Sequence, residues 1–209
     1  MKIAMKLLAA AGAAALVIVA SPAMAAAPYT VSAGSQTTGT AAIDGATDDI
    51  IFYTEFVEMG CDSGSATDDA NLGTNSTGLG VANIDDTAWN GCLGPLNIPM
   101  TVDQVGIWNL NVQGDNVGGV IAGTISNVEA RIASATPGQC EFTVTGQVGG
   151  SFNENTQQLT VDDTSPDTDL VVRDVRGCFG LVLADDPAFF SATYDMTNSS
   201  DGGLAIASS

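Results

Sequence analysis

The sequence predicts an all-β protein, an antiparallel β-sandwich or barrel-like domain with two disulfides that follows a cleaved signal peptide. Short segments of alternating apolar and polar residues are separated at regular intervals by glycine, asparagine, aspartate and serine. This pattern is typical of antiparallel strands joined by tight turns. No segment after residue 25 repeats its apolar residues with the 3.6-residue period of an amphipathic helix, so no such helix is expected.

Residues 1–25 have the three parts of a secretory signal peptide. Lys2 and Lys6 supply a basic start, residues 7–20 form an apolar run, and the Ala-Met-Ala of residues 23–25 offers small side chains to a signal peptidase. The apolar run is shorter than the roughly 20 residues that a membrane-spanning helix needs. We therefore expect cleavage after residue 25 and a secreted, extracellular or cell-surface protein.

The rest of the chain divides into two parts by composition. Residues 26–48 are small and polar, with a few apolar residues around Tyr29, and form either a polar lead-in or a first strand. Residues 49–209 are long enough to bury one hydrophobic core, so we expect a single β domain there.

After the signal peptide the chain is strongly acidic. Both lysines lie in residues 1–25, so only three arginines oppose all 24 acidic residues, a net charge of −21 (3 against 24). So acidic a surface repels phosphate backbones and anionic lipids, which argues against nucleic-acid partners and against stable membrane insertion after signal cleavage. Self-association and envelope components remain as expected partners. Salt adaptation and calcium binding would both explain the acidity.

Four cysteines behind an export signal predict two disulfides. Three pairings are possible, and we favour Cys61–Cys92 with Cys140–Cys178 because each pair brackets a coherent piece of chain. Each bridge would contribute roughly 3–4 kcal/mol by restricting the unfolded chain. The absence of histidine and of any Cys-x-x-Cys argues against a zinc site.

The first part of the β domain combines a strand with a long loop region. Residues 49–58 (DIIFYTEFVE) carry β-branched and aromatic residues on both parities, which predicts a strand buried largely on both faces. The segment between Cys61 and Cys92 is rich in glycine and aspartate, with one short apolar piece near 79–84. We expect a loop region there, held by its disulfide.

The middle of the chain alternates more clearly. In GIWNLNVQG, Trp108, Leu110 and Val112 share one face, which indicates an inward-facing set. In GVIAGTISNVEARIAS the apolar residues change parity half-way along the segment. A β-bulge near Ser126-Asn127 would reconcile the two halves.

Four further strands follow. CEFTVTGQVGGSF places Phe142, Val144 and Val148 on one face, with Gly149-Gly150 expected as a two-residue hairpin turn. The remaining strands are expected in QQLTVDD, DLVVRDV and AFFSATYDM.

A turn and an inward-facing aromatic pair are expected near the end of the chain. Asp185-Asp186-Pro187 forms the turn before the final strand, AFFSATYDM. That strand packs Phe190 and Tyr194 inward.

Catalysis is not expected. Serine and cysteine nucleophiles need a histidine or lysine base, and the chain after residue 25 has neither. A pair of carboxylates could still hydrolyse glycosides, with Glu129, Glu141 and Asp174 as candidates, but their positions fit ordinary solvent-facing acids.

Calcium is the one cofactor that the acids could bind. The stretch DDTSPDTD gathers Asp162, Asp163, Asp167 and Asp169, which are the candidate calcium ligands. No EF-hand pattern is present, so solvated turn acids are the favoured interpretation and no cofactor is expected.

Three aromatic residues could bind a sugar or an apolar ligand. Tyr53, Trp89 and Trp108 could form a stacking platform. Trp108 fits the core because it alternates with apolar neighbours. Trp89, beside Cys92 in the expected loop, is the better candidate for a ligand contact.

Residues 50–196 contain a recognisable order of motifs: a cysteine strand, an aromatic-Asn turn, a Leu-x-Val strand, a Gly-Cys-x-Gly-Leu box and a strand ending in tyrosine. The positions that carry it are Cys140, Gly146, Phe152-Asn153, Leu159, Val161, Gly177–Leu181 and Tyr194, with Trp89–Cys92 and Ile107–Leu110 ahead of them. In this order the chain resembles a family of small secreted actinobacterial β-domains of unassigned function.

This family is distantly similar to secreted proteins described as activators of alkane oxidation. The usual Gly-Asp after the box is Asp185-Asp186 here. The resemblance implies a disulfide-bonded secreted β-domain and brings no catalytic residues.

Together these features predict an exported cell-envelope or extracellular protein with a structural, assembly or binding role and no catalysis. A structural protein would lend an edge strand such as the Tyr29 segment to a neighbour. The alternatives are a carbohydrate- or apolar-ligand-binding module, with or without calcium, and a carboxylate-based glycoside hydrolase.

Overall fold

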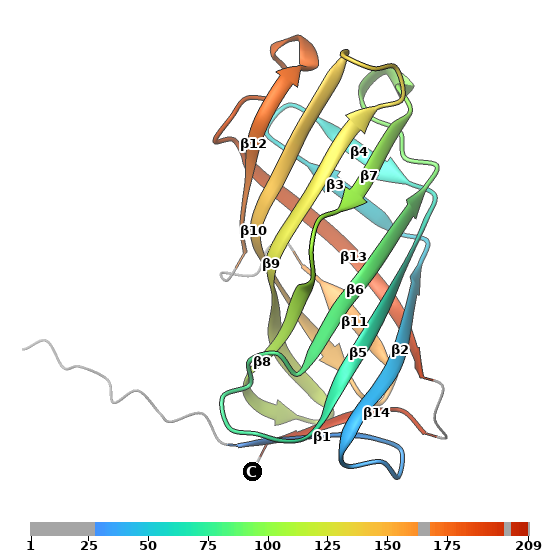
Figure 1. Ribbon diagram of the computed structural model, residues 1–209, viewed down its shortest axis with the longest axis vertical. Coiled ribbons are helices and arrows are strands. Elements are labelled where there is room, and N and C mark those ends of the chain that lie inside the picture. The colour runs from blue at the N-terminus through green and yellow to red at the C-terminus, as the bar shows by residue number, and fades with distance from the viewer. Residues whose placement is uncertain (1–27, 163–167, 199–201, 209) are drawn as a thin grey trace, which may run out of the picture.

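A computed structural model describes residues 28–162, 168–198 and 202–208, which form one antiparallel sheet of fourteen strands and two short 3₁₀ turns (Figure 1). The elements described are β1 (Tyr29–Ala33), β2 (Gly39–Thr47), β3 (Ile50–Tyr53), β4 (Glu58–Cys61), β5 (Ser63–Asn75), β6 (Ala82–Asn90), η1 (Pro95–Asn97), β7 (Met100–Gln104), β8 (Trp108–Val117), β9 (Val120–Ser134), β10 (Cys140–Asn153), β11 (Gln158–Val161), β12 (Asp169–Gly177), η2 (Cys178–Gly180), β13 (Pro187–Asn198) and β14 (Leu204–Ser208). In these ranges no helix is long and apolar enough to cross a membrane. The expected all-β antiparallel class is confirmed.

The sheet closes on itself. From β2 the hydrogen-bonded path runs through β5, β6, β8, β9, β10, β11 and β13, and β13 pairs with β2 again. Further along the same long strands, β12 takes the place of β11 between β10 and β13, and β7 pairs with β9. Of the two expected architectures, the structure is therefore the barrel-like one, with one face of each strand directed inward.

The chain ends cover one end of this closed sheet. β1 pairs with β14 and with the last residues of β5, and the two terminal strands cross the lower end in Figure 1. Tyr29 is buried there and donates a hydrogen bond from its hydroxyl to the Gly114 carbonyl at 3.0 Å. Of the two interpretations of residues 26–48, the structure has strands, because both β1 and β2 belong to the sheet.

Both disulfides pair as expected. Cys61–Cys92 joins the end of β4 to the segment after β6, and Cys140–Cys178 joins the start of β10 to η2. The predicted bulge is also present in β9: the pairing with β10 shifts register opposite Ser126-Asn127, where Asn127 has a φ of 58°. Val128 consequently faces inward on a different parity from Ile125.

The prediction of a loop region between Cys61 and Cys92 is wrong. This segment contains the whole of the long strands β5 and β6. Several inward-facing residues of β5 are small, and at Gly64 larger side chains of neighbouring strands occupy the space. A Cβ on Gly64 would lie 2.6 Å from Cδ1 of Ile50 and 3.1 Å from Cδ1 of Trp89.

Two further expectations were wrong. Gly149-Gly150 is not a turn but lies within β10, where a Cβ on Gly150 would overlap the Thr160 carbonyl oxygen of β11. The expected strand over residues 49–58 ends at Tyr53, and Phe56 is exposed in the turn before β4. In both places the strand-to-strand distance, which is not visible in the residue pattern, decides the local conformation.

Candidate functional site

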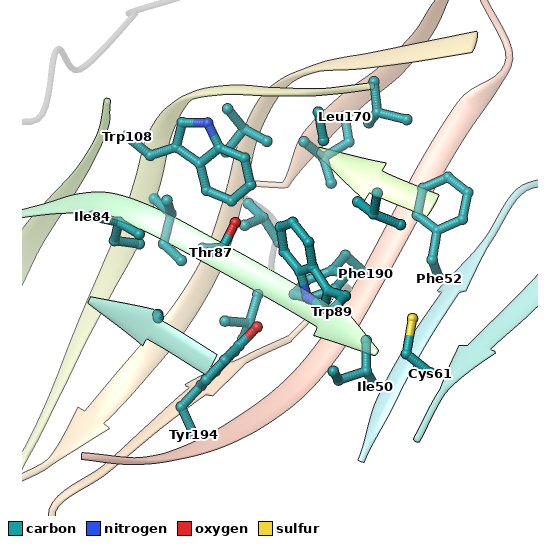
Figure 2. A pocket seen from close by; sticks show the side chains of 18 of the residues that line it. Ile50, Phe52, Cys61, Ile84, Thr87, Trp89, Trp108, Leu170, Phe190 and Tyr194 are labelled. Carbon is teal, nitrogen blue, oxygen red and sulfur yellow. The ribbon is translucent and has the colours of Figure 1, made fainter. Parts of the chain in front are cut away.

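The closed sheet encloses an apolar cavity of about 70 Å³. Strands from all sides line it, and Figure 2 shows how their side chains converge. Its lining includes Ile50, Phe52, Ala66, Asp68, Ile84, Thr87, Trp89, Trp108, Ile125, Val148, Leu170, Phe190, Tyr194 and Met196. Only a few polar groups interrupt this apolar wall, which is the composition of small-molecule sites in proteins.

A second cavity of about 50 Å³ lies next to the first, towards the end covered by β1 and β14. The two cavities share lining residues, namely Ile125, Leu159, Val161 and Met196. The two cavities are therefore adjacent inside the closed sheet.

The two tryptophans of the chain both face this cavity. Trp89 comes from β6 and Trp108 from β8, and their ring centroids lie 6.1 Å apart with planes tilted by 36°. A register shift between β5 and β6 leaves Asp85 as an extra residue, so Thr87 and Trp89 face inward on the opposite parity from Ile84. This bulge, a common device for redirecting a side chain, brings Trp89 into the cavity.

Asp68 is the one acidic residue that lines the cavity. It follows the inward alternation of β5, on the parity of Ala66 and Ala70, and its backbone lies between Ile43 of β2 and Ile84 of β6. It is only 3% exposed, and neither carboxylate oxygen has a hydrogen-bond partner in the described part of the chain.

Burial changes the acid–base properties of two cavity residues. Desolvation, together with the smaller effects of the nearby charges of Asp85, Asp44 and Asp69, raises the pKa of Asp68 from 3.8 to about 7. Desolvation also raises the pKa of Tyr194 to about 12; the neighbouring Trp89 N–H lowers it, and the Asp68 charge raises it. Asp68 and Tyr194 are thus within electrostatic reach of each other.

Other polar groups of the cavity wall are also unpartnered in the residues described. These are the indole N–H groups of Trp89 and Trp108 and the hydroxyl of Thr87. The Trp89 N–H is near enough to the Tyr194 hydroxyl to affect its pKa, yet it makes no hydrogen bond of normal geometry. Buried polar groups are usually paired, so a group of unpaired ones around a cavity indicates a place for a bound molecule.

The wall of the cavity is weakest between β6 and β7. These two strands lie side by side, but in the described residues no backbone ladder joins them. The Gln104 side chain bridges them instead, donating from Nε2 to the Ile84 carbonyl at 3.0 Å and to the Gly106 carbonyl at 2.8 Å.

The three aromatic residues considered as ligand contacts differ in their position relative to the cavity. Trp108 is buried in the core, as expected. Trp89 lies in a strand rather than in a loop, half-buried, with its ring on the cavity. Tyr53 does not join them, because its ring stacks on Phe189 with centroids 4.8 Å apart.

The calcium candidates gain no support from the described residues. Asp163 and Asp167 lie outside those residues, and Asp162 and Asp169 are exposed. Asp169 lines a shallow hollow on the outer surface together with Glu129. In the part of the chain that the structure describes, no three acids, histidines or cysteines cluster as a metal site would require.

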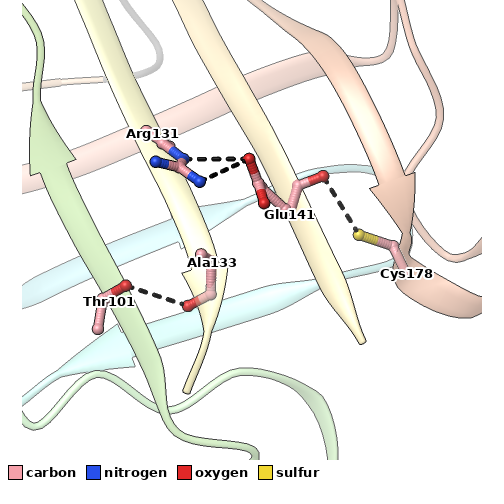
Figure 3. A network of polar contacts seen from close by, with 5 residues as sticks. All are labelled: Thr101, Arg131, Ala133, Glu141 and Cys178. Carbon is pink, nitrogen blue, oxygen red and sulfur yellow. Dashed lines mark hydrogen bonds and ion pairs between the residues drawn. The ribbon is translucent and has the colours of Figure 1, made fainter. Parts of the chain in front are cut away.

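The carboxylates considered for glycoside hydrolysis lie outside the cavity. Glu141 is engaged with Arg131 across β9 and β10, with Oε1 accepting from Nε at 3.1 Å and from Nη2 at 2.8 Å (Figure 3). Glu129 and Asp174 are exposed. An exposed ion pair of this kind contributes little to stability.

Asp68 is the cavity residue that sequence reasoning missed. It belongs to one of five Asp-Asp pairs in the sequence, and adjacent acids of this kind are usually solvated. A signal was present, because Asp68 shares its parity with Gly64, Ala66, Ala70 and Leu72. The alternation was not recognised because glycine and alanine are too small to mark an apolar face in a sequence.

Searches against protein-family models, curated proteins and solved structures found no match to this chain. The resemblance to secreted actinobacterial β-domains therefore stays a prediction, and function has to be argued from the cavity.

Proposed function

We propose that this chain is an exported binding protein that holds a small, mostly apolar molecule inside its closed sheet. The observation that carries the proposal is the cavity itself, an apolar space bordered by four side chains whose polar atoms are buried and unpartnered in the described residues: Asp68, Thr87, Trp89 and Trp108. Natural ligand sites combine a large apolar surface with a few polar groups that fix orientation. A core selected only for stability would replace these polar groups with apolar ones.

The export signal and the two disulfides support an extracellular or cell-surface location for this binding role. A ligand that travels outside the cell in water would gain from an enclosed apolar site. Sequencing the N-terminus of the exported protein tests the location, and we expect the chain to begin at residue 26.

We prefer ligand binding to an assembly role based on strand exchange. The Tyr29 segment, the candidate for donation, is already paired on both sides, with β14 and with β5. Its release would expose Tyr29 and Val31, which are fully buried. Asp68 is the one acid among the residues that line the cavity, so hydrolysis by a carboxylate pair is not proposed.

Binding of a neutral apolar probe tests the proposal. Isothermal titration calorimetry of the disulfide-bonded chain with 1-hexanol should show saturable binding of one molecule. Ala66→Leu, which fills the cavity from β5, should weaken binding by about tenfold or more, as expected for a site with little spare room.

A matched variant separates this effect from a general change in the sheet. Ala88 is exposed on the outer face of the neighbouring strand β6, opposite Ser65. Ala88→Leu should leave the affinity unchanged. If Ala66→Leu binds 1-hexanol as tightly as the unmodified chain, the ligand does not occupy this cavity.

A further inference from the structure

We propose that the cavity selects a protonated amine on an apolar body, with its ammonium group bound by the Asp68 carboxylate and by the faces of Trp89 and Trp108. This inference rests on the proposed binding function and names the chemical class of its ligand.

The first argument is the charge of the cavity. Asp68 is only 3% exposed to solvent. In the described residues its two carboxylate oxygens have no hydrogen-bond partner. The arginines of the chain, at 131, 173 and 176, are all exposed and absent from the cavity lining. A carboxylate in such a place is strongly destabilised unless a cation joins it, and among the described residues no basic side chain lines the cavity.

The surroundings of Asp68 add negative potential from its own strand and from the two strands that flank it. Asp44 of β2, Asp85 of β6 and Asp69 of β5 all act on it electrostatically in the same direction. Tyr194 of β13 stays neutral at physiological pH because its pKa is about 12. An anionic ligand such as a carboxylate would be repelled from this cavity, whereas a cation would be attracted.

The second argument is the aromatic wall. Two indole rings with centroids 6.1 Å apart line the cavity that Asp68 also lines. The faces of tryptophan rings attract organic ammonium groups, and the attraction grows when water is excluded. A buried acid together with aromatic faces therefore recognises an ammonium ion more specifically than either would alone.

The rest of the cavity lining indicates that the remainder of the ligand is apolar. Beyond the polar groups the walls are apolar, and a second cavity lies on the other side of the shared residues Ile125 and Met196. An alkyl or aryl chain attached to the ammonium group would extend in this direction. The ligand class is thus a small monoamine with an apolar tail rather than a polyamine or an amino acid, whose additional charges would be left without partners.

Three probes of equal length test the selection: hexylammonium, 1-hexanol and hexanoate. Calorimetry at pH 8 should show hexylammonium binding at least about tenfold more tightly than 1-hexanol, and hexanoate binding weakest. From pH 8 to pH 5 hexylammonium affinity should fall by about tenfold as Asp68 gains a proton, while the alkylamine stays protonated throughout. The affinity for 1-hexanol should be nearly constant over this range.

Asp68→Asn should remove the preference, so that hexylammonium binds no more tightly than 1-hexanol. The matched control is Asp86→Asn, which removes a charge from an exposed position on β6. This control should keep the preference and its pH dependence. The comparison of probes on the unmodified chain needs no variant, so it stands even if Asp68→Asn does not fold.

The outcomes distinguish amine selection from the apolar-ligand binding on which it rests. Equal binding of 1-hexanol and hexylammonium, or an unchanged preference in Asp68→Asn, would overturn amine selection and leave apolar-ligand binding in place. Failure of all three probes to bind would overturn the binding function as well.

Discussion

Replacing Asp68 by asparagine should change how the stability of the protein depends on pH. In the folded protein burial raises the pKa of Asp68 from 3.8 to about 7. Between these two values the folded chain keeps a proton that the unfolded chain has already released. The free energy of unfolding therefore contains a contribution from Asp68 that is fully present below pH 4 and is lost as the pH rises towards 7.

The size of this effect follows from the shift. Each pKa unit corresponds to 1.36 kcal/mol, so a shift of about three units amounts to roughly 4 kcal/mol. Because Asp68 is 3% exposed, solvent screens this interaction only weakly. Asparagine has a similar shape but does not titrate, so the contribution should be absent from the variant.

Urea unfolding followed by tryptophan fluorescence, with the disulfides intact, measures the difference. The free energy of unfolding of Asp68→Asn relative to the unmodified chain should rise by roughly 4 kcal/mol between pH 4 and pH 8. Asp86→Asn, on the exposed surface of β6, should show no such rise. A relative change below about 1 kcal/mol for Asp68→Asn would refute the burial of an unpartnered acid.

Three further predictions concern the framework of the cavity. One of the three tyrosines should ionise near pH 12 in an ultraviolet titration of the folded protein, and Tyr194→Phe should remove that step. Gly150→Ala should destabilise the protein by about 1–3 kcal/mol in urea unfolding, because its Cβ would overlap the Thr160 carbonyl, whereas Gly60→Ala, with its nearest atom 3.8 Å away, should cost much less. Removing the Cys140–Cys178 bridge, whose cysteines are 38 residues apart, by a double alanine substitution should lower the free energy of unfolding by about 4 kcal/mol.

The sequence predicts the parts of the fold where large side chains alternate. Trp108, Leu110 and Val112 mark β8, and Phe190 and Tyr194 mark β13, because burying a large apolar side chain leaves a clear period-2 pattern. The bulge in β9 was predictable for the same reason, since the apolar residues change parity there.

The period-2 pattern did not predict a strand where small residues face inward. In β5 the inward positions include Gly64, Ala66 and Asp68, which together resemble a polar loop. Their size makes sense only once β6 and β3 place Trp89 and Ile50 above them, and that proximity comes from tertiary pairing. For the same reason the closure of the sheet, which depends on β13 pairing with β2, could not be predicted from local periodicity.

The candidate site was predictable only in part. Trp89 was selected as a ligand contact, and it lines the cavity, although it does so from a strand. Asp68 was missed because an acid among glycines and alanines is normally solvated. Trp89 lines the same cavity as Asp68 because the bulge at Asp85 changes the parity of β6.

Binding inside the closed sheet is the central claim, and the two indole N–H signals of the chain test it most directly. Both tryptophans line the cavity, so a ¹H–¹⁵N spectrum reports on that space through two well-separated signals. Titration with 1-hexanol and with hexylammonium should shift both signals with one common dissociation constant for each probe. Indole signals that stay in place while surface amides shift would contradict the account.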